Sequence, residues 1–211
     1  MTQQKYTPVF NSKNVEIKSI ERAFDGFFKI NTFTFRHAKF AGGQSDWVQR
    51  EIFERGHAVG VLPYDPLNQK VVLIEQIRIG ALATKDSPWL LEIIAGMVDK
   101  ESEQLEEVAI REAQEEANLV IDELTPMLSY LSSPGGTTER LYLYLAEVNS
   151  EDAGGIFGLD TEHEDIKVHV LDVDHAFELL DNGVIDNAAA VIALQWLRLK
   201  LVKEGHNKYV Q

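Results

Sequence analysis

The segment from residue 96 to residue 119 constrains the fold of this 211-residue chain more than any other stretch. Apolar residues recur from Leu105 with the i, i+3, i+4 spacing of an amphipathic helix, which we expect over residues 102–117. At about 100° per residue, Glu112 and Glu116 continue that apolar stripe. Unpaired carboxylates are costly to bury, so these two residues require a neutralising partner or a shifted pKa.

A hard divalent cation with oxygen ligands would neutralise two such carboxylates. Arg111 lies four residues before Glu115, where an ion pair could fix the acidic face of the helix. An ordinary solvated acidic helix has the same composition, and the spacing alone leaves that alternative open. Further residues are needed to decide between a metal site and a solvated face.

The segment resembles the Nudix box, whose pattern is G-x5-E-x7-R-E-U-x-E-E-x-G-U, where U is an apolar residue. The residues in register with this pattern are Glu103, Arg111, Glu112, Ala113, Glu115, Glu116 and Leu119. Two positions depart from it, because six residues rather than five separate Gly96 from Glu103, and Asn118 replaces the second Gly. Asn tolerates a left-handed helix C-cap, and loops before helices tolerate insertions, so both departures are physically mild.

The resemblance extends beyond the box, to the bacterial ADP-ribose-cleaving branch of the Nudix hydrolase superfamily. A proline soon after the box, here Pro134, is typical of that branch. The supporting strings are GFF (26–28), REIFERGHA (50–58), VVLIEQIRIG (71–80), PWLLEIIAGM (88–97), SSPGGTTER (132–140), EHEDIKVHV (162–170) and IDNAAAVIALQWL (185–197). Nearly the whole chain is therefore covered.

The resemblance implies hydrolysis of the ADP-ribose pyrophosphate to AMP and ribose 5-phosphate, with more than one Mg²⁺ or Mn²⁺ ion per site. The implied metal ligands are the backbone carbonyl of Ala95 and the carboxylates of Glu112, Glu115, Glu116 and Glu164. Glu162 is implied as the general base, because a carboxylate not committed to metal can take a proton from the attacking water. His163 is the weaker alternative base, since a lone histidine on a loop is usually just exposed.

The resemblance also implies a set of substrate contacts. These are Phe27, Phe28, Arg50, Glu51, Arg55, Arg78, Met97, Ser133, Pro134, Gly135 and Glu139. Guanidinium forks can grip phosphate or ribose, although arginines at strand ends are more often simple surface residues. On a strand only one of two adjacent phenylalanines can face the core, which would leave the other to stack on adenine, in the family across a dimer interface.

Strand and helix patterns interleave along the chain, which predicts the α/β (α+β) class: a Nudix α/β/α sandwich with a mixed sheet. Apart from the acidic helix, the expected strands are 58–64, 71–77, 89–95, 124–131, 141–148 and 166–171, and the expected helices are 174–180 and 187–202. Residues 1–56 are expected to form a small N-terminal β segment used for dimerisation. Residues 57–211 then form the Nudix hydrolase domain.

The net charge of −14 argues against nonspecific binding to nucleic acid or to anionic membranes. The chain has no cysteine, which fits a reducing cytoplasm, and no apolar run of transmembrane length or signal peptide is recognised. We therefore expect a cytoplasmic homodimer whose partners are its own second copy and the small-molecule substrate ADP-ribose. Neither nucleic acid nor membrane is an expected partner.

Three alternatives stay open at this point. Another nucleoside diphosphate sugar, such as GDP-mannose, could be the substrate. A catalytically silent ADP-ribose sensor is disfavoured, because every expected carboxylate is present and no basic helix-turn-helix is found. A structural Ca²⁺ or Mg²⁺ module lacks support, since the chain contains no D-x-[DN]-x-[DN]-G loop.

Overall fold

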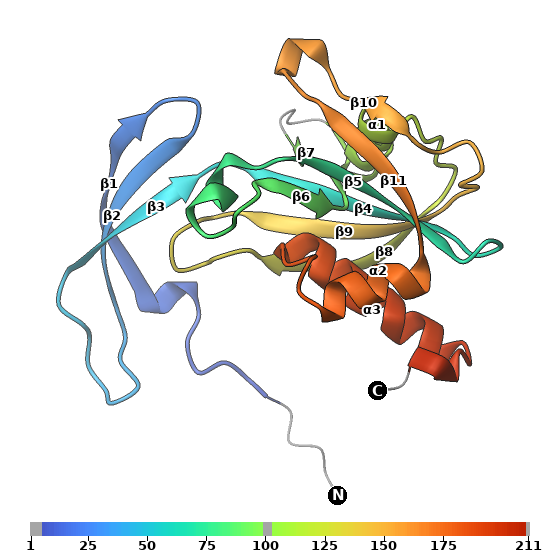
Figure 1. The fold of residues 1–211 in the computed structure, drawn as a ribbon. Helices are drawn as coiled ribbons and strands as arrows, with labels where there is room; N and C mark the ends of the chain where they lie inside the picture. The colour runs from blue at the N-terminus through green and yellow to red at the C-terminus, as the bar shows by residue number, and fades with distance from the viewer. Residues whose placement is uncertain (1–5, 99–102, 210–211) are drawn as a thin grey trace, which may run out of the picture. The chain divides into compact units, whose positions relative to one another are not determined.

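The computed structural model describes residues 6–98 and 103–209, which form two compact units (Figure 1). The first unit contains the chain up to Arg55 together with Ser133–Glu139. The second contains Gly56–Ser132 and the chain from Arg140 onward. The chain therefore leaves the first unit, returns to it for seven residues, and leaves it again.

The first unit is built on an antiparallel sheet of three strands, β1 (Val15–Asp25), β2 (Lys29–His37) and β3 (Val48–Glu54). The returning segment joins β3, because the Phe53 amide donates to the Gly136 carbonyl at 2.8 Å and the Thr137 hydroxyl donates to the Phe53 carbonyl at 2.8 Å. This segment is thus held by backbone pairing rather than by its own turn alone.

The sheet of the first unit buries almost nothing within that unit. Among its described residues, only Glu139 is buried, and no apolar side chain is. Small sheets are normally stable only when one face packs against another element. Dimerisation through this unit stays a prediction, and the lack of an apolar core within the unit is compatible with it.

The second unit contains an eight-stranded mixed sheet, as predicted from the interleaved pattern. Six strands run in the order β10-β11-β5-β4-β9-β8, all antiparallel except the parallel pair β4 and β9. Their bounds are β4 (His57–Asp65), β5 (Lys70–Ile77), β8 (Leu124–Leu131), β9 (Arg140–Glu147), β10 (Gly155–Phe157) and β11 (Ile166–Asp172).

The two remaining strands correct the prediction of one strand over 89–95. That stretch forms β6 (Trp89–Glu92), which pairs with β5, and then β7 (Ile94–Val98), which pairs with β4. β4 and β5 pair with each other only at their joined ends, so the space between their other ends is filled by this bent segment. The partner changes at Ile93, whose side chain is buried.

Helices cover both faces of the sheet, which confirms the α/β/α sandwich (Figure 1). The helix α1 (Leu105–Ala117) packs on one face, and α2 (Val173–Asp181) and α3 (Ala188–Lys203) pack on the other. Successive side chains of a strand point to opposite faces of the sheet, so Leu73 of β5 packs in the core under α2 and α3, while Ile74 packs in the core under α1. No helix within the described ranges is long and apolar enough to cross a membrane.

A buried carboxylate ties the β4–β5 turn to the segment after β9. Asp65, only 1% exposed, accepts hydrogen bonds from the amides of Leu67, Asn68 and Ser150 at 2.9–3.0 Å and from the Ser150 hydroxyl at 2.8 Å. Burial alone would raise the pKa of Asp65, but these donors hold it well below its ordinary value. The turn is therefore fixed by a charged acceptor.

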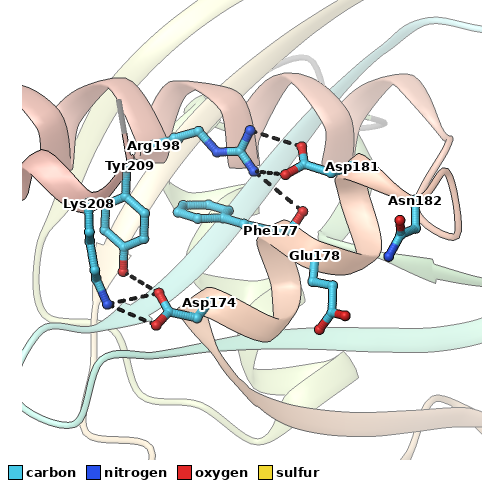
Figure 2. Close-up of a pocket in the computed structure, with 8 residues that line it drawn as sticks. All are labelled: Asp174, Phe177, Glu178, Asp181, Asn182, Arg198, Lys208 and Tyr209. Atoms are coloured by element: carbon cyan, nitrogen blue, oxygen red, sulfur yellow. Dashed lines mark hydrogen bonds and ion pairs between the residues drawn. The ribbon is translucent and has the colours of Figure 1, made fainter. Parts of the chain in front are cut away.

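A hollow of about 340 Å³ lies where the C-terminal turn (Asn207–Tyr209) meets α2 and α3 (Figure 2). Most of its charged groups are paired: the Arg198 guanidinium donates to the two oxygens of Asp181 at 2.9 and 2.8 Å, and Asp174 accepts from Lys208 Nζ at 2.9 Å and from the Tyr209 hydroxyl at 2.7 Å. The hollow lies on the side of the sheet away from α1. These contacts hold the C-terminal turn against α2 and α3.

Candidate active site

The acidic helix α1 begins later than predicted and ends where predicted. Its first helical residue is Leu105, and the amide of the preceding Gln104 donates to the Glu107 carboxylate at 3.0 Å, which closes the first turn. Residue 102, where the helix was expected to start, lies outside the described residues. At the other end Asn118 adopts a left-handed conformation with φ of 52°, the role that Gly has in the family pattern.

Glu116 is almost fully buried on the face of α1 that packs against the sheet. Its side chain, in a residue only 3% exposed, accepts a hydrogen bond from the Ala95 amide at 3.1 Å. Burial raises the pKa of Glu116 to about 8; the Ala95 bond opposes the shift, whereas the charges of Glu112 and Glu164 add to it. This carboxyl favours a proton or a cation beside it.

Glu112 lies one turn before Glu116 and rests directly on the backbone of Gly96. A Cβ atom at position 96 would lie 1.9 Å from Glu112 Oε1 and 2.0 Å from its Cδ. Only glycine leaves room for this carboxylate, although the backbone of Gly96 has no positive φ to demand one. Burial raises the pKa of Glu112 to about 7, with Arg111 opposing and Glu115 contributing.

Arg111 organises the solvent side of this cluster. Its Nε lies 3.1 Å from Glu103 Oε1, and its Nη1 lies 2.8 Å from Glu112 Oε1 and 3.0 Å from Glu115 Oε2. Burial by itself would lower the pKa of Arg111, but the three carboxylates raise it above its ordinary value. One guanidinium thus holds three of the box carboxylates in place.

The second acidic element lies between β10 and β11. The Glu164 carboxylate accepts from the Leu159 amide at 3.1 Å, and its Cβ packs against Gly158. Its charge raises the pKa of both Glu112 and Glu116, so it faces the α1 carboxylates. The backbone of Glu162 ends a short 3₁₀ turn (Asp160–Glu162), and its side chain lies outside the described part of the structure.

The residues present suit a divalent cation in chemical character. They offer several hard oxygen donors, and the raised pKa values of two of them show that added positive charge is favourable there. Among the described residues, no three acidic or histidine side chains are already drawn together in a metal shell. Glu116 and Glu164 are instead each engaged with a backbone N–H, and Glu112 with Arg111.

Two predicted substrate contacts lie in the second unit. Arg78 directly follows β5, and its Nε lies 2.9 Å from Glu92 Oε2. Met97 lies on β7 beside Gly96, and strand alternation turns its side chain to the face opposite Glu112. Glu92 was not predicted as a functional residue, although its charge at the end of an otherwise apolar strand could have drawn attention to it.

In the first unit, the structure brings three predicted substrate residues together. The Arg55 Nε lies 3.1 Å from Glu139 Oε1, and the Arg55 guanidinium lies 5.8 Å from the ring centroid of Phe28. Residues 55 and 139 come from the two separate pieces of this unit. This pairing gives Glu139, the one buried residue among those described in this unit, the charged partner that a buried carboxylate requires.

The other predicted contacts of the first unit are more exposed. Phe27 and Phe28 lie in the turn between β1 and β2 rather than on a strand, and Phe27 is 86% exposed. Arg50 and Glu51 are exposed on β3. The rest, Ser133, Pro134 and Gly135, are exposed in the returning segment.

Comparison with known proteins agrees with this arrangement. A family model described as a NUDIX domain matches residues 54–194. The ADP-ribose pyrophosphatase of Escherichia coli (strain K12) is 52% identical over 190 residues, which cover 90% of each protein. The GDP-mannose pyrophosphatase of Enterobacter sp. (strain 638) is 30% identical over 190 residues, covering 89% of this chain and 97% of its own.

A crystal structure of an ADP compounds hydrolase has the same fold, with a TM-score of 0.68 and 20% identity over 91% of this chain and 96% of its own. The chain therefore belongs to the Nudix family and is a Nudix hydrolase. Members of this family generally use divalent metal ions.

Proposed function

We propose that this protein hydrolyses ADP-ribose to AMP and ribose 5-phosphate with Mg²⁺ as the preferred ion. The observation that carries the proposal is the desolvated pair Glu112 and Glu116, which lie one turn apart on α1 against the backbone of Ala95 and Gly96. The identity to the E. coli enzyme supports ADP-ribose over GDP-mannose, because it is 52% against 30%.

In the proposed reaction, a water oxygen attacks the adenosine-side phosphorus and the bond from that phosphorus to the bridging oxygen breaks. The bridging oxygen leaves with ribose 5-phosphate, and Glu162 accepts the proton of the attacking water. Bound divalent ions, held by Glu112, Glu115, Glu116, Glu164 and the Ala95 carbonyl, would offset the charge of the pyrophosphate and acidify water. Arg78 would bind a phosphate oxygen through its guanidinium.

We also propose that the first unit makes a homodimer and contributes substrate contacts. Its unburied sheet supplies the surface, and the exposed Phe27 ring is free to stack on adenine. Sedimentation at working concentration measures this directly. A monomer would contradict the proposal.

The test of the reaction is product analysis in ¹⁸O-labelled water with Mg²⁺. AMP carrying the label, with unlabelled ribose 5-phosphate, is the expected result, and label in ribose 5-phosphate would place the attack on the other phosphorus. A parallel incubation with GDP-mannose measures the competing substrate. Faster release of products from GDP-mannose than from ADP-ribose would overturn the substrate assignment.

Two substitutions test the roles of the carboxylates. Glu162→Gln should lower kcat by at least 100-fold while ADP-ribose still binds, since general base catalysis typically contributes about 10²–10⁴-fold. Glu112→Gln should remove the response of the rate to Mg²⁺. A Glu162→Gln variant with near-normal kcat would contradict the assignment of the base.

A further inference from the structure

Arg78 makes one side-chain hydrogen bond to a described residue, and that bond has an unusual partner. Its Nε donates to Glu92 Oε2 at 2.9 Å. The Glu92 side chain is only 14% exposed, whereas that of Arg78 is 46% exposed. A mostly buried carboxylate thus holds the inner edge of a guanidinium whose other edge faces solvent.

The register of β5 and β6 shows how far Arg78 must reach to make this contact. Glu92 lies opposite Ile74, and Leu90 lies opposite Gln76, while the Arg78 amide continues the ladder by donating to Pro88. To reach Glu92, the Arg78 side chain therefore runs back along the sheet over the Gln76–Leu90 pair. That pair lies two residues from Arg78, which is about 7 Å at the usual strand rise.

This part of the sheet lies on the face that packs against α1. Ile74, opposite Glu92, belongs to the core packed against α1, so Glu92 and Arg78 share that face. Within the described residues, neither Nη of Arg78 donates a hydrogen bond, so the outer fork is available for an oxyanion.

We propose that Glu92 is a positioning residue: it fixes the Nε edge of Arg78 so that the two Nη groups present a fork to a phosphate oxygen of the substrate. The inference rests on the proposed function, because it assigns Arg78 to the pyrophosphate. A guanidinium held at one edge binds an oxyanion without first losing its rotamer freedom, and this preorganisation lowers the cost of binding.

The direction of the change in ligand binding on neutralising Glu92 distinguishes a positioning role from a purely electrostatic one. If Glu92 acted only through its charge, its neutralisation would strengthen the binding of an anion near Arg78. If it positions Arg78, neutralisation weakens binding, because the hydrogen bond that holds the guanidinium loses the charge of its acceptor. The two roles therefore predict opposite changes for Glu92→Gln.

Calorimetric titration with ADP-ribose in EDTA measures binding without turnover. We expect Glu92→Gln and Arg78→Ala each to weaken binding by about tenfold, in line with the loss of one hydrogen bond to a charged group. The double variant should bind no more weakly than Arg78→Ala alone, since Glu92 acts through Arg78. In Mg²⁺, Glu92→Gln should raise KM with kcat within about twofold, the pattern expected when only ground-state binding changes.

The matched control is Glu75→Gln. Glu75 lies on β5, the strand that pairs with β6, but on the opposite face, where its Oε2 lies 2.8 Å from His169 Nε2. Its neutralisation changes a half-buried side-chain contact without touching Arg78, and binding should stay unchanged. Thermal melting of every variant checks that each one is folded.

Unchanged or tighter binding of ADP-ribose by folded Glu92→Gln overturns the positioning role. An additive loss in the double variant overturns it as well, because Glu92 would then act independently of Arg78. If the wild-type protein does not bind ADP-ribose, the proposed function fails, and inorganic pyrophosphate replaces it as the probe for the same comparison. Failure of the wild-type protein to bind either probe overturns both proposals.

Discussion

Substitution of Gly96 by alanine should disable the site while leaving the fold intact. The added Cβ would lie 2.0 Å from Glu112 Cδ and 2.3 Å from its Cγ. Carbon atoms in contact prefer a separation of about 3.5 Å or more, so the carboxylate must retreat by about 1.5 Å. The backbone at position 96 has ordinary dihedrals, so alanine is not strained there and the side chain of Glu112 is the group that moves.

A displacement of this size should lower kcat with Mg²⁺ by about 100-fold, because misplacement of a catalytic group by 1 Å can have that effect. The Arg111–Glu112 contact at 2.8 Å should break with it. Steady-state rates over a series of Mg²⁺ concentrations measure the effect, and the half-saturating concentration should rise. Thermal melting should show a small change, since the displaced group lies at the edge of the core.

Gly80→Ala is the matched control for Gly96→Ala. A Cβ at position 80 meets nothing within 4 Å, and its φ is not positive. This variant should keep the wild-type rate and Mg²⁺ response. If Gly96→Ala also keeps both, Glu112 is either not held against Gly96 or not needed for the metal, and the reasoning fails.

Three further outcomes follow from buried groups. Because the pKa of Glu116 is raised from 4.5 to about 8, the metal-free protein should lose stability as pH rises from 5 to 9. Glu116→Gln should flatten that loss, measured by melting in EDTA; an equally steep fall would contradict the shift. Gly60→Ala should destabilise the protein by about 1–3 kcal/mol in denaturant unfolding, since its Cβ would lie 2.8 Å from Ile93 and Leu143. Asp65→Asn should destabilise by about 1–3 kcal/mol because its amide N–H faces donors, and an unchanged midpoint would refute this.

Much of α1 could be predicted because helix periodicity is local. The apolar stripe placed Glu112 and Glu116 on the packed face, and the structure confirms burial of Glu116. The left-handed conformation of Asn118 was also predictable from residue type. The start of the helix was not, since its N-cap is Gln104, a residue type with no strong preference for that position.

Long-range pairing explains what the sequence did not reveal. The stretch 89–95 is apolar apart from Glu92, so no periodicity signals that its partner changes at Ile93. The three-residue strand β10 is too short for a pattern, and its pairing with β11 defines it. Likewise, the role of Glu92 could not be predicted, because it depends on the strand register that brings Arg78 to it.

The returning segment of the first unit has a consequence for the order of synthesis. The hydroxyl of Thr137 that bonds to Phe53 belongs to a residue 84 positions later in the chain. At about 5–20 residues per second, a ribosome needs roughly 4–17 s to supply it. During that interval the edge of β3 is unpaired and can associate with a strand of another chain, so the N-terminal sheet is open to misassociation early in synthesis.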